Sequence, residues 1–486
     1  MQKPFYITTT LPYVNADPHI GFALEIVHAD IQARNQRLQG REVFFTTGTD
    51  EHGQKIAQKA EEQGTDVQQY VDHYAGQFEK LKLALNLSYD SFIRTTDAKH
   101  VAAAQELWKR CERAGDIEKR KYKGLYCVGD EMFLKETDIV NGKCPNHPNM
   151  DPIEIEEENY FFLLSKYQQR LTEYLSREDV ILPSWRRDEA LKFVEQGLED
   201  FSISREKARM SWGIPVPADD AQVMYVWFDA LTNYISTLGW PCFAKATQGK
   251  PDLFERFWTH GETVQLAGKD QVRFQSIMWQ AMLMSANLKP SDKVVYHGFI
   301  TSGGQKMSKS LGNVIEPFAI VDEYGTDALR YYLARHISPF EDSDFTMERF
   351  KELYNADLVN GVGNAVARVM QLASTHGANS SYAEADIEKP LEDESFSNAM
   401  KGYDLQLYMS LVQAHVTSID AEITATQPFK VIKEDKERGM KMLSLLADKI
   451  FVLGLMLKPI IPGTAQIILE SVVANKKPTN LFPRKE

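Results

Sequence analysis

The sequence predicts an α/β protein in which a doubly wound parallel sheet is interrupted by an insertion and followed by an all-helical part. Three observations lead to this fold class. β-rich and helical segments alternate from residue 5 to about residue 113, the alternation stops between about residues 116 and 222 before it resumes, and only helical periodicity is seen beyond about residue 351. A strand that rejoins its sheet through a helix makes a parallel, right-handed crossover. We therefore expect five successive segments, at residues 1–115, 116–223, 224–295, 296–350 and 351–486.

The first crossover is formed by residues 5 to 50. Residues 5–10 are an unbroken β-rich run, residues 23–38 repeat apolar side chains at helical spacing, and residues 42–50 are a second β-rich run. A helix at residues 67–85 follows, because apolar side chains recur there three and four residues apart. These elements form the first half of the predicted sheet domain.

The turn after the first strand is suited to bind an anion. Asp17 is a favourable N-cap and Pro18 suits the first helical position, so we expect the first helix to begin there. His19 and Gly21 would then lie in the first turn of that helix, where free N–H groups and the helix dipole favour negative charge.

The second half of the sheet leads into a loop with two lysines. Strand, helix and strand signals return at residues 263–270, 272–286 and 293–300, and the stretch GGQKMSKSLGN follows. Lys306 and Lys309 lie three residues apart in this loop, and mobile positive charge of this kind suits the triphosphate of ATP. Ligands of a doubly wound sheet lie beyond the carboxyl ends of its strands. We therefore expect this loop and the turn after the first strand to face one nucleotide.

The composition is that of an ordinary globular protein. The 486 residues suffice for two or three domains, with 43% apolar and 25% charged residues. The N-terminus lacks an apolar signal core, and no apolar run is long enough to span a bilayer. Four cysteines do not make a disulfide framework in such a chain, so we expect a reducing, cytoplasmic setting and no membrane. The net charge of −13 argues against general coating of nucleic acid but allows a local basic face.

The motifs PHIGF and KMSKS, in this order on a sheet with an insertion, resemble those of the class I aminoacyl-tRNA synthetases. The stretches LPYVNADPHIG, FTTGTDEHG, YVWFDALTNYI, GKD, HGFI and YGTDALRYYL narrow the resemblance to the methionyl-tRNA synthetases, and it covers essentially the whole chain. The resemblance implies a Rossmann-like catalytic domain, a connective-peptide insertion and a helical-bundle anticodon-binding domain. It also implies activation of L-methionine by ATP with Mg²⁺, followed by transfer of methionine to the 3′ end of tRNA(Met).

The resemblance assigns residues to the nucleotide. His19, Lys306 and Lys309 would meet the negative charge that grows as pyrophosphate leaves, and such charge stabilisation is usually a dominant catalytic contribution. Asp270 resembles the residue that accepts hydrogen bonds from the ribose. The expected catalytic residues are His19, Gly21, Lys306 and Lys309, and the expected ATP-binding residues are His19, Gly21, Gly268, Asp270, His297, Gly298, Ile300 and Lys309.

The resemblance also assigns a methionine pocket. Asp50 would meet the substrate ammonium with help from the backbone of Leu11, and aromatic rings would surround the thioether, since sulfur–ring contacts are favourable. The expected pocket consists of Leu11, Tyr13, Asp50, Val226, Trp227, Ala230, Leu231, Tyr234, Gln271 and Gln275. Arg205 matches a family position that couples the insertion to the active site.

Three positions depart from the family pattern. Phe22 stands where a second histidine is usual, and a phenyl ring cannot donate to a phosphate. His28 is no substitute, because it lies about half a turn round the helix from His19. Gln271 and Gln275 stand where the family usually has isoleucine and histidine, so the readout of the methionine side chain is expected to differ in detail.

Four residues have the spacing of a zinc knuckle: Cys127, Asp130, Cys144 and His147. The family usually has cysteine at the second of these places, but aspartate also binds zinc. A knuckle that has lost its metal and folds by packing alone remains the alternative. Cys111 and Cys242 have no partners at ligand spacing and are interpreted as buried thiols.

The helical part is expected to bind the anticodon. Asn364 and Arg368 lie four residues apart on one helix face, and Phe429 occupies a position that is usually tryptophan. By resemblance, these three side chains would read the anticodon through hydrogen bonds and stacking. The chain ends at Glu486, leaving no room for an appended dimerising domain, so a monomer is expected.

Two alternatives remain at this stage. One is a class I synthetase for cysteine, leucine, isoleucine or valine, although the insertion is short for the editing domains of the larger enzymes. The other is a non-catalytic tRNA-binding protein derived from a synthetase, for which Phe22 and the two glutamines would be an argument. The presence of His19, Lys306, Lys309 and Asp270 argues against it.

Overall fold

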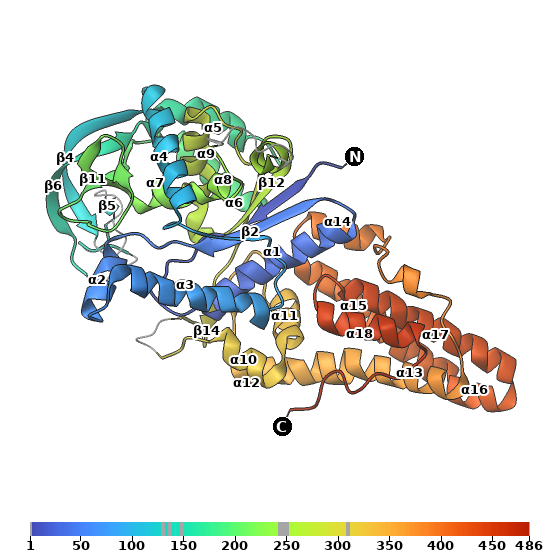
Figure 1. The fold of residues 1–486 in the computed structure, drawn as a ribbon. Helices are drawn as coiled ribbons and strands as arrows, with labels where there is room; N and C mark the ends of the chain where they lie inside the picture. Colours follow the sequence, from blue (N-terminus) through green and yellow to red (C-terminus); the bar gives the residue numbers. More distant parts are fainter. Residues whose placement is uncertain are drawn as a thin grey trace. The chain divides into compact units, whose positions relative to one another are not determined.

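The computed structural model describes residues 2–127, 132–134, 139–140, 142–145, 150–241, 252–307 and 312–485 (Figure 1). The chain forms two compact units. Unit 1 consists of Met1–Asp17, Phe44–Lys80 and Tyr89–Tyr296, and unit 2 of Pro18–Val43, Leu81–Ser88 and His297–Glu486.

Unit 1 is built on a six-stranded sheet with the order β3-β2-β1-β12-β13-β7. Its strands are β1 (Phe5–Thr8), β2 (Val43–Thr49), β3 (Ser91–Arg94), β7 (Ile181–Leu182), β12 (Glu262–Gly268) and β13 (Lys293–His297). The pairs β1–β12, β2–β3 and β13–β7 are parallel. The chain runs outward from β1 on one side and from β12 on the other, so the switch point lies between these two strands. The predicted doubly wound parallel sheet is confirmed.

Helices flank this sheet: α2 (Gln54–Glu62), α3 (Val67–Ala84), α4 (Ala98–Arg113), α5 (Gln168–Leu175), α6 (Ser184–Glu195), α7 (Val226–Leu231), α8 (Asn233–Ser236) and α9 (Trp279–Ser285). α4 packs against α7, α8 and α9 around the buried rings of Trp108, Trp258 and Trp279. The single helix expected at 272–286 is instead a π-helical turn, η5 (Phe274–Met278), that continues into α9. Such turns are frequent at functional sites.

The insertion is antiparallel, in keeping with the loss of strand–helix alternation that predicted it. One sheet has the order β5-β4-β6-β8, with β4 (Ile117–Cys127), β5 (Met132–Leu134), β6 (Ile153–Phe162) and β8 (Phe201–Ser202). A second sheet holds β9 (Ser204–Glu206), β10 (Pro215–Val216) and β11 (Asp219–Met224). The long strands β4 and β6 run side by side (Figure 1).

Unit 2 is mainly helical. Its helices are α1 (Ile20–Leu38), α10 (Pro317–Tyr324), α11 (Thr326–Arg335), α12 (Met347–Leu353), η7 (Tyr354–Gly363), α13 (Asn364–His376), α14 (Glu394–Lys401), α15 (Leu405–Thr426), α16 (Pro428–Glu434), α17 (Lys436–Leu457) and α18 (Pro462–Val473). A small sheet joins β14 (Ile300–Ser302) to β15 (Gln305–Lys306) and β16 (Ser343–Asp344). Among the described residues, no helix combines the length and apolarity needed to cross a bilayer.

A buried ion pair ties α1 to the rest of unit 2. Arg330 of α11 lies 2.8 Å from the carboxylate of Asp30 on α1, and both side chains are fully buried. The guanidinium also donates to the carbonyl oxygens of Leu85 and Ile460, at 3.0 and 2.7 Å. A buried charge is tolerated only when it is paired and hydrogen-bonded in this way. Arg330 therefore fixes α1 against the helical part of its own unit.

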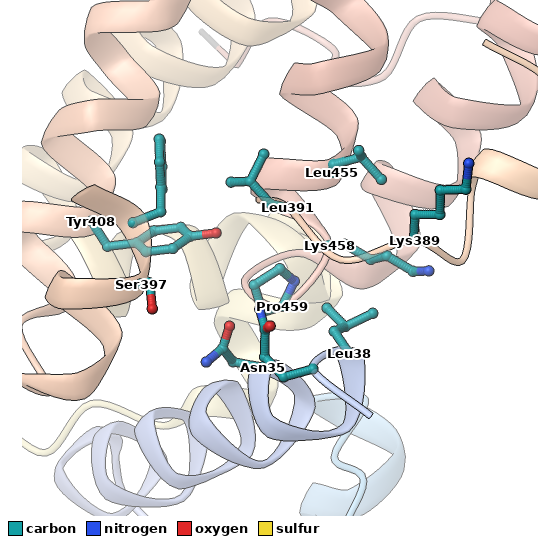
Figure 2. A pocket seen from close by; sticks show the side chains of 11 residues that line it. Asn35, Leu38, Lys389, Leu391, Ser397, Tyr408, Leu455, Lys458 and Pro459 are labelled. Atoms are coloured by element: carbon teal, nitrogen blue, oxygen red, sulfur yellow. The ribbon is translucent and has the colours of Figure 1, made fainter. Parts of the chain in front are cut away.

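The same helix also packs closely farther along its length. Figure 2 shows Asn35 and Leu38 of α1 beside Leu391, Leu455 and Pro459 of the helical part. The space between them is only about 20 Å³, which is room for roughly one water molecule.

Candidate active site

The start of α1 presents an imidazole. The helix begins at Ile20 with His19 as its N-cap, so the expectation that Asp17 caps the helix was wrong. The Nδ1 atom of His19 accepts a hydrogen bond of 3.0 Å from the backbone N–H of Gly21. A Cβ atom on Gly21 would lie 2.8 Å from the His19 ring, so glycine is needed for the ring to fold back in this way.

This hydrogen bond fixes the chemistry of His19. Because Nδ1 is an acceptor, the ring proton of the neutral form must lie on Nε2, which is left as a donor. Burial lowers the pKa of His19, which favours the neutral form at physiological pH. His19 is therefore set to donate a hydrogen bond to an anion at the helix N-terminus.

The lysine loop and the start of α1 are close together within unit 2. The backbone N–H of Ile20 donates to the carbonyl oxygen of Ile315, at 3.0 Å. The methyl group of Met307 lies 3.8 Å from where a Cβ of Gly21 would stand. Lys306 ends β15 and is exposed, whereas Lys309 lies outside the described residues. Residues on both sides of Lys309 thus adjoin the turn of His19.

Three further residues predicted to bind ATP lie beside β14. His297 is held by Glu25, whose carboxylate is 2.8 Å from Nε2, and by the carbonyl oxygen of Gly298, 2.8 Å from Nδ1. A Cβ atom on Gly298 would collide with the backbone of Glu341 at 2.1 Å. Gly298 is therefore required by the fold itself, apart from its predicted role in binding ATP. Ile300 is buried as the first residue of β14.

In unit 1, the turns after β1 and β2 meet. The Asp50 N–H donates to the carbonyl oxygen of Pro12, and the Val14 N–H donates to that of Asp50, at 2.9 and 3.1 Å. This bridge places Asp50 beside Tyr13, with Leu11 half-buried in the same turn. Only the family resemblance predicted that Asp50 would lie close to residues 11–14 (LPYV).

The aromatic part of the predicted methionine pocket is assembled in unit 1. The ring of Trp227 stacks on Phe274 with centroids 3.8 Å apart and an interplanar angle of 12°. Val226, Ala230 and Leu231 share helix α7 with Trp227, and all three are buried.

The two glutamines that depart from the family pattern have different surroundings. The amide of Gln275 donates to the hydroxyl of Tyr234, and both side chains are buried. The amide of Gln271 donates instead to Asp270, at 2.9 Å. Gln271 and Asp270 lie in the short 3₁₀ turn after Gly268, at the end of β12. Gln271 is therefore engaged with the residue expected to hold the ribose.

One buried network was missed by sequence reasoning. Asp229 accepts from His52 Nδ1 and His100 Nε2, each at 2.7 Å, and His100 Nδ1 lies 2.9 Å from the hydroxyl of Ser236. Burial alone would raise the pKa of Asp229, but the charge of His52 and hydrogen bonds from both imidazoles lower it. His52 lies two residues after Asp50 in FTTGTDEHG, and this proximity to a predicted site residue is the sequence feature that could have indicated the network.

Only half of the predicted zinc knuckle can be placed. Cys127 and Cys144 are buried in one small cluster with Leu134, which suits a shared metal as well as apolar packing. Asp130 and His147 lie outside the described residues, and the described part of the chain holds no group of three metal-ligating side chains. Cys111 is buried as expected, while Cys242 lies outside the described residues.

The predicted anticodon residues lie on the helices of unit 2. Asn364 begins α13, and Arg368 on the same helix pairs with Asp420 at 2.9 Å. Phe429 in α16 is 39% exposed, and Trp185 and Leu407 are among the other large apolar side chains that are exposed. The exposed ring of Phe429 is accessible for base stacking.

A doubly wound sheet with its switch point at β1 and β12, a His–Gly helix start and a lysine hairpin together define a class I aminoacyl-tRNA synthetase. A family model described as "tRNA synthetases class I (M)" matches residues 5–153 and 148–370. The chain belongs to the methionyl-tRNA synthetase family.

Known relatives agree with this assignment. The methionine–tRNA ligase of Rhizobium meliloti (strain 1021) is 38% identical, with 97% of this chain and 92% of the relative covered. That of Thermosynechococcus vestitus is 40% identical, with 96% and 90% covered. A solved structure of Mycobacterium tuberculosis methionyl-tRNA synthetase with methionyl-adenylate has a TM-score of 0.88 at 32% identity, covering 100% of this chain and 99% of that one.

Proposed function

We propose that this chain is an active methionine–tRNA ligase. It joins L-methionine to AMP at the expense of ATP, releases pyrophosphate, and then transfers methionine to the 3′ end of tRNA(Met). The observation that carries this proposal is the start of α1, where the turn that holds His19 adjoins Met307 and Ile315, on either side of Lys309.

In the first step, a carboxylate oxygen of methionine attacks the α-phosphorus of ATP, and the bond to the pyrophosphate oxygen breaks. Mg²⁺ enters with ATP and offsets part of its charge. His19 Nε2–H donates to the phosphates at the positive end of the α1 dipole, and Lys306 and Lys309 follow the charge on the leaving pyrophosphate. Gly21 allows the His19 ring to take this position. Asp270 binds the ribose, while Gly268, His297, Gly298 and Ile300 form the adenosine side of the site.

The methionine pocket holds the amino acid while its carboxylate reacts. Asp50 pairs with the substrate ammonium, and the stacked rings of Trp227 and Phe274 offer an aromatic surface to the thioether. The Asp229 network orients His52 close to Asp50. Leu11, Tyr13, Val226, Ala230, Leu231, Tyr234, Gln271 and Gln275 complete the pocket.

In the second step, a ribose hydroxyl at the 3′ end of the tRNA attacks the activated carbonyl, and AMP leaves. The helical part binds the anticodon through Asn364, Arg368 and Phe429. The enzyme acts as a monomer in the cytoplasm. Zn²⁺, if bound, would be held by Cys127, Asp130, Cys144 and His147 and would support the fold of the insertion.

Amino-acid-dependent ATP–pyrophosphate exchange tests the proposal. We expect exchange with methionine and weaker exchange with norleucine, because one altered group in an apolar pocket discriminates by only about 1–3 kcal/mol. Exchange with another amino acid alone would identify a different synthetase. Absence of exchange with any amino acid would identify a binding protein derived from one.

A further inference from the structure

Residues 50–53 form the loop between β2 and α2 that carries Asp50, and every residue of this loop is held by a neighbour. Asp50 is bridged to the turn after β1 by backbone hydrogen bonds. Glu51 is fully buried, and its carboxylate accepts two hydrogen bonds from Arg94, at 2.6 and 2.9 Å. The N–H of Glu51 donates to the hydroxyl of Thr95, at 2.9 Å. Strand β3 and the residue after it thus fix one side of the loop.

The other side of the loop is fixed by Trp212 of the insertion. The indole N–H of Trp212 donates to the carbonyl oxygen of Glu51, at 2.6 Å. The N–H of Gly53 donates to the carbonyl oxygen of Trp212, at 3.1 Å. The indole ring also lies against His52, with ring centroids 5.6 Å apart at an interplanar angle of 57°. One half-buried residue of the insertion therefore contacts all three residues that follow Asp50.

Both the loop and the turn that holds Trp212 are attached to helix α7 of the predicted methionine pocket. Met224 ends β11, just before this helix, and its N–H donates to the carbonyl oxygen of Ile214, at 2.7 Å. Ile214 follows Trp212 by two residues. On the loop, His52 Nδ1 lies 2.7 Å from Asp229 of α7. The loop expected to hold the substrate ammonium and the helix expected to hold its thioether are thus tied together.

We propose that Trp212 is a positioning residue for the amino acid, because it holds the Glu51 peptide so that the adjoining Asp50 carboxylate meets the substrate ammonium. The inference rests on the proposed function, because it requires methionine as the substrate. Trp212 acts through the loop and takes no part in the chemistry. The insertion thereby contributes to the affinity of the catalytic sheet for methionine.

The physical reason is the cost of an unsatisfied carbonyl group. A buried carbonyl oxygen that loses its donor is unfavourable, so without the indole N–H the loop would adopt other conformations. Asp50 would be displaced in those conformations, and methionine would bind only the fraction of molecules that keep it in place. The apparent affinity for methionine falls by that fraction. ATP is bound by other residues, so its affinity should not fall.

The test compares Trp212→Phe with the control Trp258→Phe. Each change removes an indole N–H that donates to a carbonyl oxygen in unit 1, and the acceptor of Trp258 is Lys289, at 3.0 Å. For Trp212→Phe we expect the KM for methionine in pyrophosphate exchange to rise about tenfold. The KM for ATP and kcat should stay within about twofold of wild type. The control should leave all three values within about twofold of wild type.

An analogue without the ammonium distinguishes positioning of Asp50 from general damage to the pocket. The probe is 4-(methylthio)butanoate, which is methionine without its amino group, used as a competitive inhibitor of exchange. Trp212→Phe should leave its inhibition constant within about twofold of the wild-type value, because Asp50 has no ammonium to meet. An inhibition constant that rises as much as the KM for methionine would overturn the proposal, as would an unchanged KM for methionine.

Thr95→Val provides a second variant in case Trp212→Phe does not fold. It keeps the shape of the side chain and removes the acceptor of the Glu51 N–H, so it loosens the same peptide from the other side. We expect the KM for methionine to rise while inhibition by 4-(methylthio)butanoate is unchanged, and any other pattern would overturn the proposal. Absence of exchange with any amino acid in wild type would instead refute the proposed function.

Discussion

The two units hold buried charge with different partners. In unit 2, Arg330 and Asp30 are fully buried, and the guanidinium is satisfied by Asp30 and by backbone carbonyl oxygens. In unit 1, the fully buried Asp229 is held by two imidazoles, those of His52 and His100. The closed network of Arg330 joins helices of unit 2 and so serves the fold, whereas the Asp229 network fixes His52, two residues after the predicted substrate-binding Asp50.

The largest effect on stability should come from removing Arg330 from its buried pair with Asp30. Removing one partner of a buried ion pair costs about 3–5 kcal/mol because the other charge is stranded. Arg330→Met should therefore lower the free energy of unfolding by that amount in urea titration. The control Arg335→Met removes a partly exposed partner of Asp357 and should cost about 1 kcal/mol or less. Equal costs for the two variants would mean that burial of the Arg330–Asp30 pair does not increase the cost of removing one partner.

The second-largest effect should come from removing the Nε2–H donor of His19 at the start of α1. His19→Ala should slow methionyl-adenylate formation by about 10²- to 10³-fold, the usual loss for one charge-stabilising donor. His19→Asn, which keeps a donor and a favourable N-cap, should recover part of that rate. Single-turnover kinetics with saturating ATP would check both variants. A rate for His19→Ala within about twofold of wild type would remove His19 from the mechanism.

A pH titration tests whether His28, which the proposed mechanism does not use, contributes to the stability of the fold. His28 Nε2 donates to the carbonyl oxygen of Leu333, and burial lowers the pKa of His28 to about 4. An unfolded histidine titrates near 6.5, so between these values the unfolded chain binds a proton that the folded chain does not. Stability from this residue is complete above pH about 6.5 and falls by about 3 kcal/mol as the pH is lowered to 4.

The measurement is the pH slope of the unfolding free energy. His28→Gln should flatten this slope between pH 6.5 and 4, whereas His260→Gln, at a side chain that is 74% exposed, should leave it unchanged. A pH slope in His28→Gln equal to that of wild type would mean that the folded protein does not hold the His28 imidazole neutral.

The smallest effect should come from the exposed ring of unit 2. Phe429→Ala should raise the KM for tRNA by an amount equivalent to about 1–3 kcal/mol and leave pyrophosphate exchange intact. Phe429→Trp should restore tRNA binding. Aminoacylation and exchange assays on the same preparations would decide the matter. A parallel loss of both activities would mean that Phe429 acts through the fold.

The sequence predicted the sheet and the motifs more accurately than their local geometry. The βαβ pattern and the proximity of the two motifs could be predicted because strand order fixes where strand ends meet. The cap of α1 could not, since aspartate is a preferred N-cap residue and histidine is not, so that the choice of His19 depends on tertiary packing. The Asp229 network joins residues more than 120 apart, and periodicity carries no information on such pairs.

The glutamines illustrate the same limit. Gln271 and Gln275 were both expected in the methionine pocket; Gln275 donates to Tyr234, another expected pocket residue, whereas Gln271 donates to Asp270, a detail that the sequence did not predict. Rotamers of this kind depend on neighbours that a single sequence does not reveal. The prediction that Gly298 binds ATP likewise could not anticipate how closely the backbone of Glu341 approaches this glycine.

The central claim is that His19 and the lysine loop act on one nucleotide. A double-mutant cycle of His19→Ala and Lys309→Ala, read by the single-turnover rate of methionyl-adenylate formation, tests it most directly. Groups that act as a unit are strongly non-additive, so the double variant should lose little more than the worse single variant. A double variant whose loss equals the full product of the two single losses would show that the two side chains act independently.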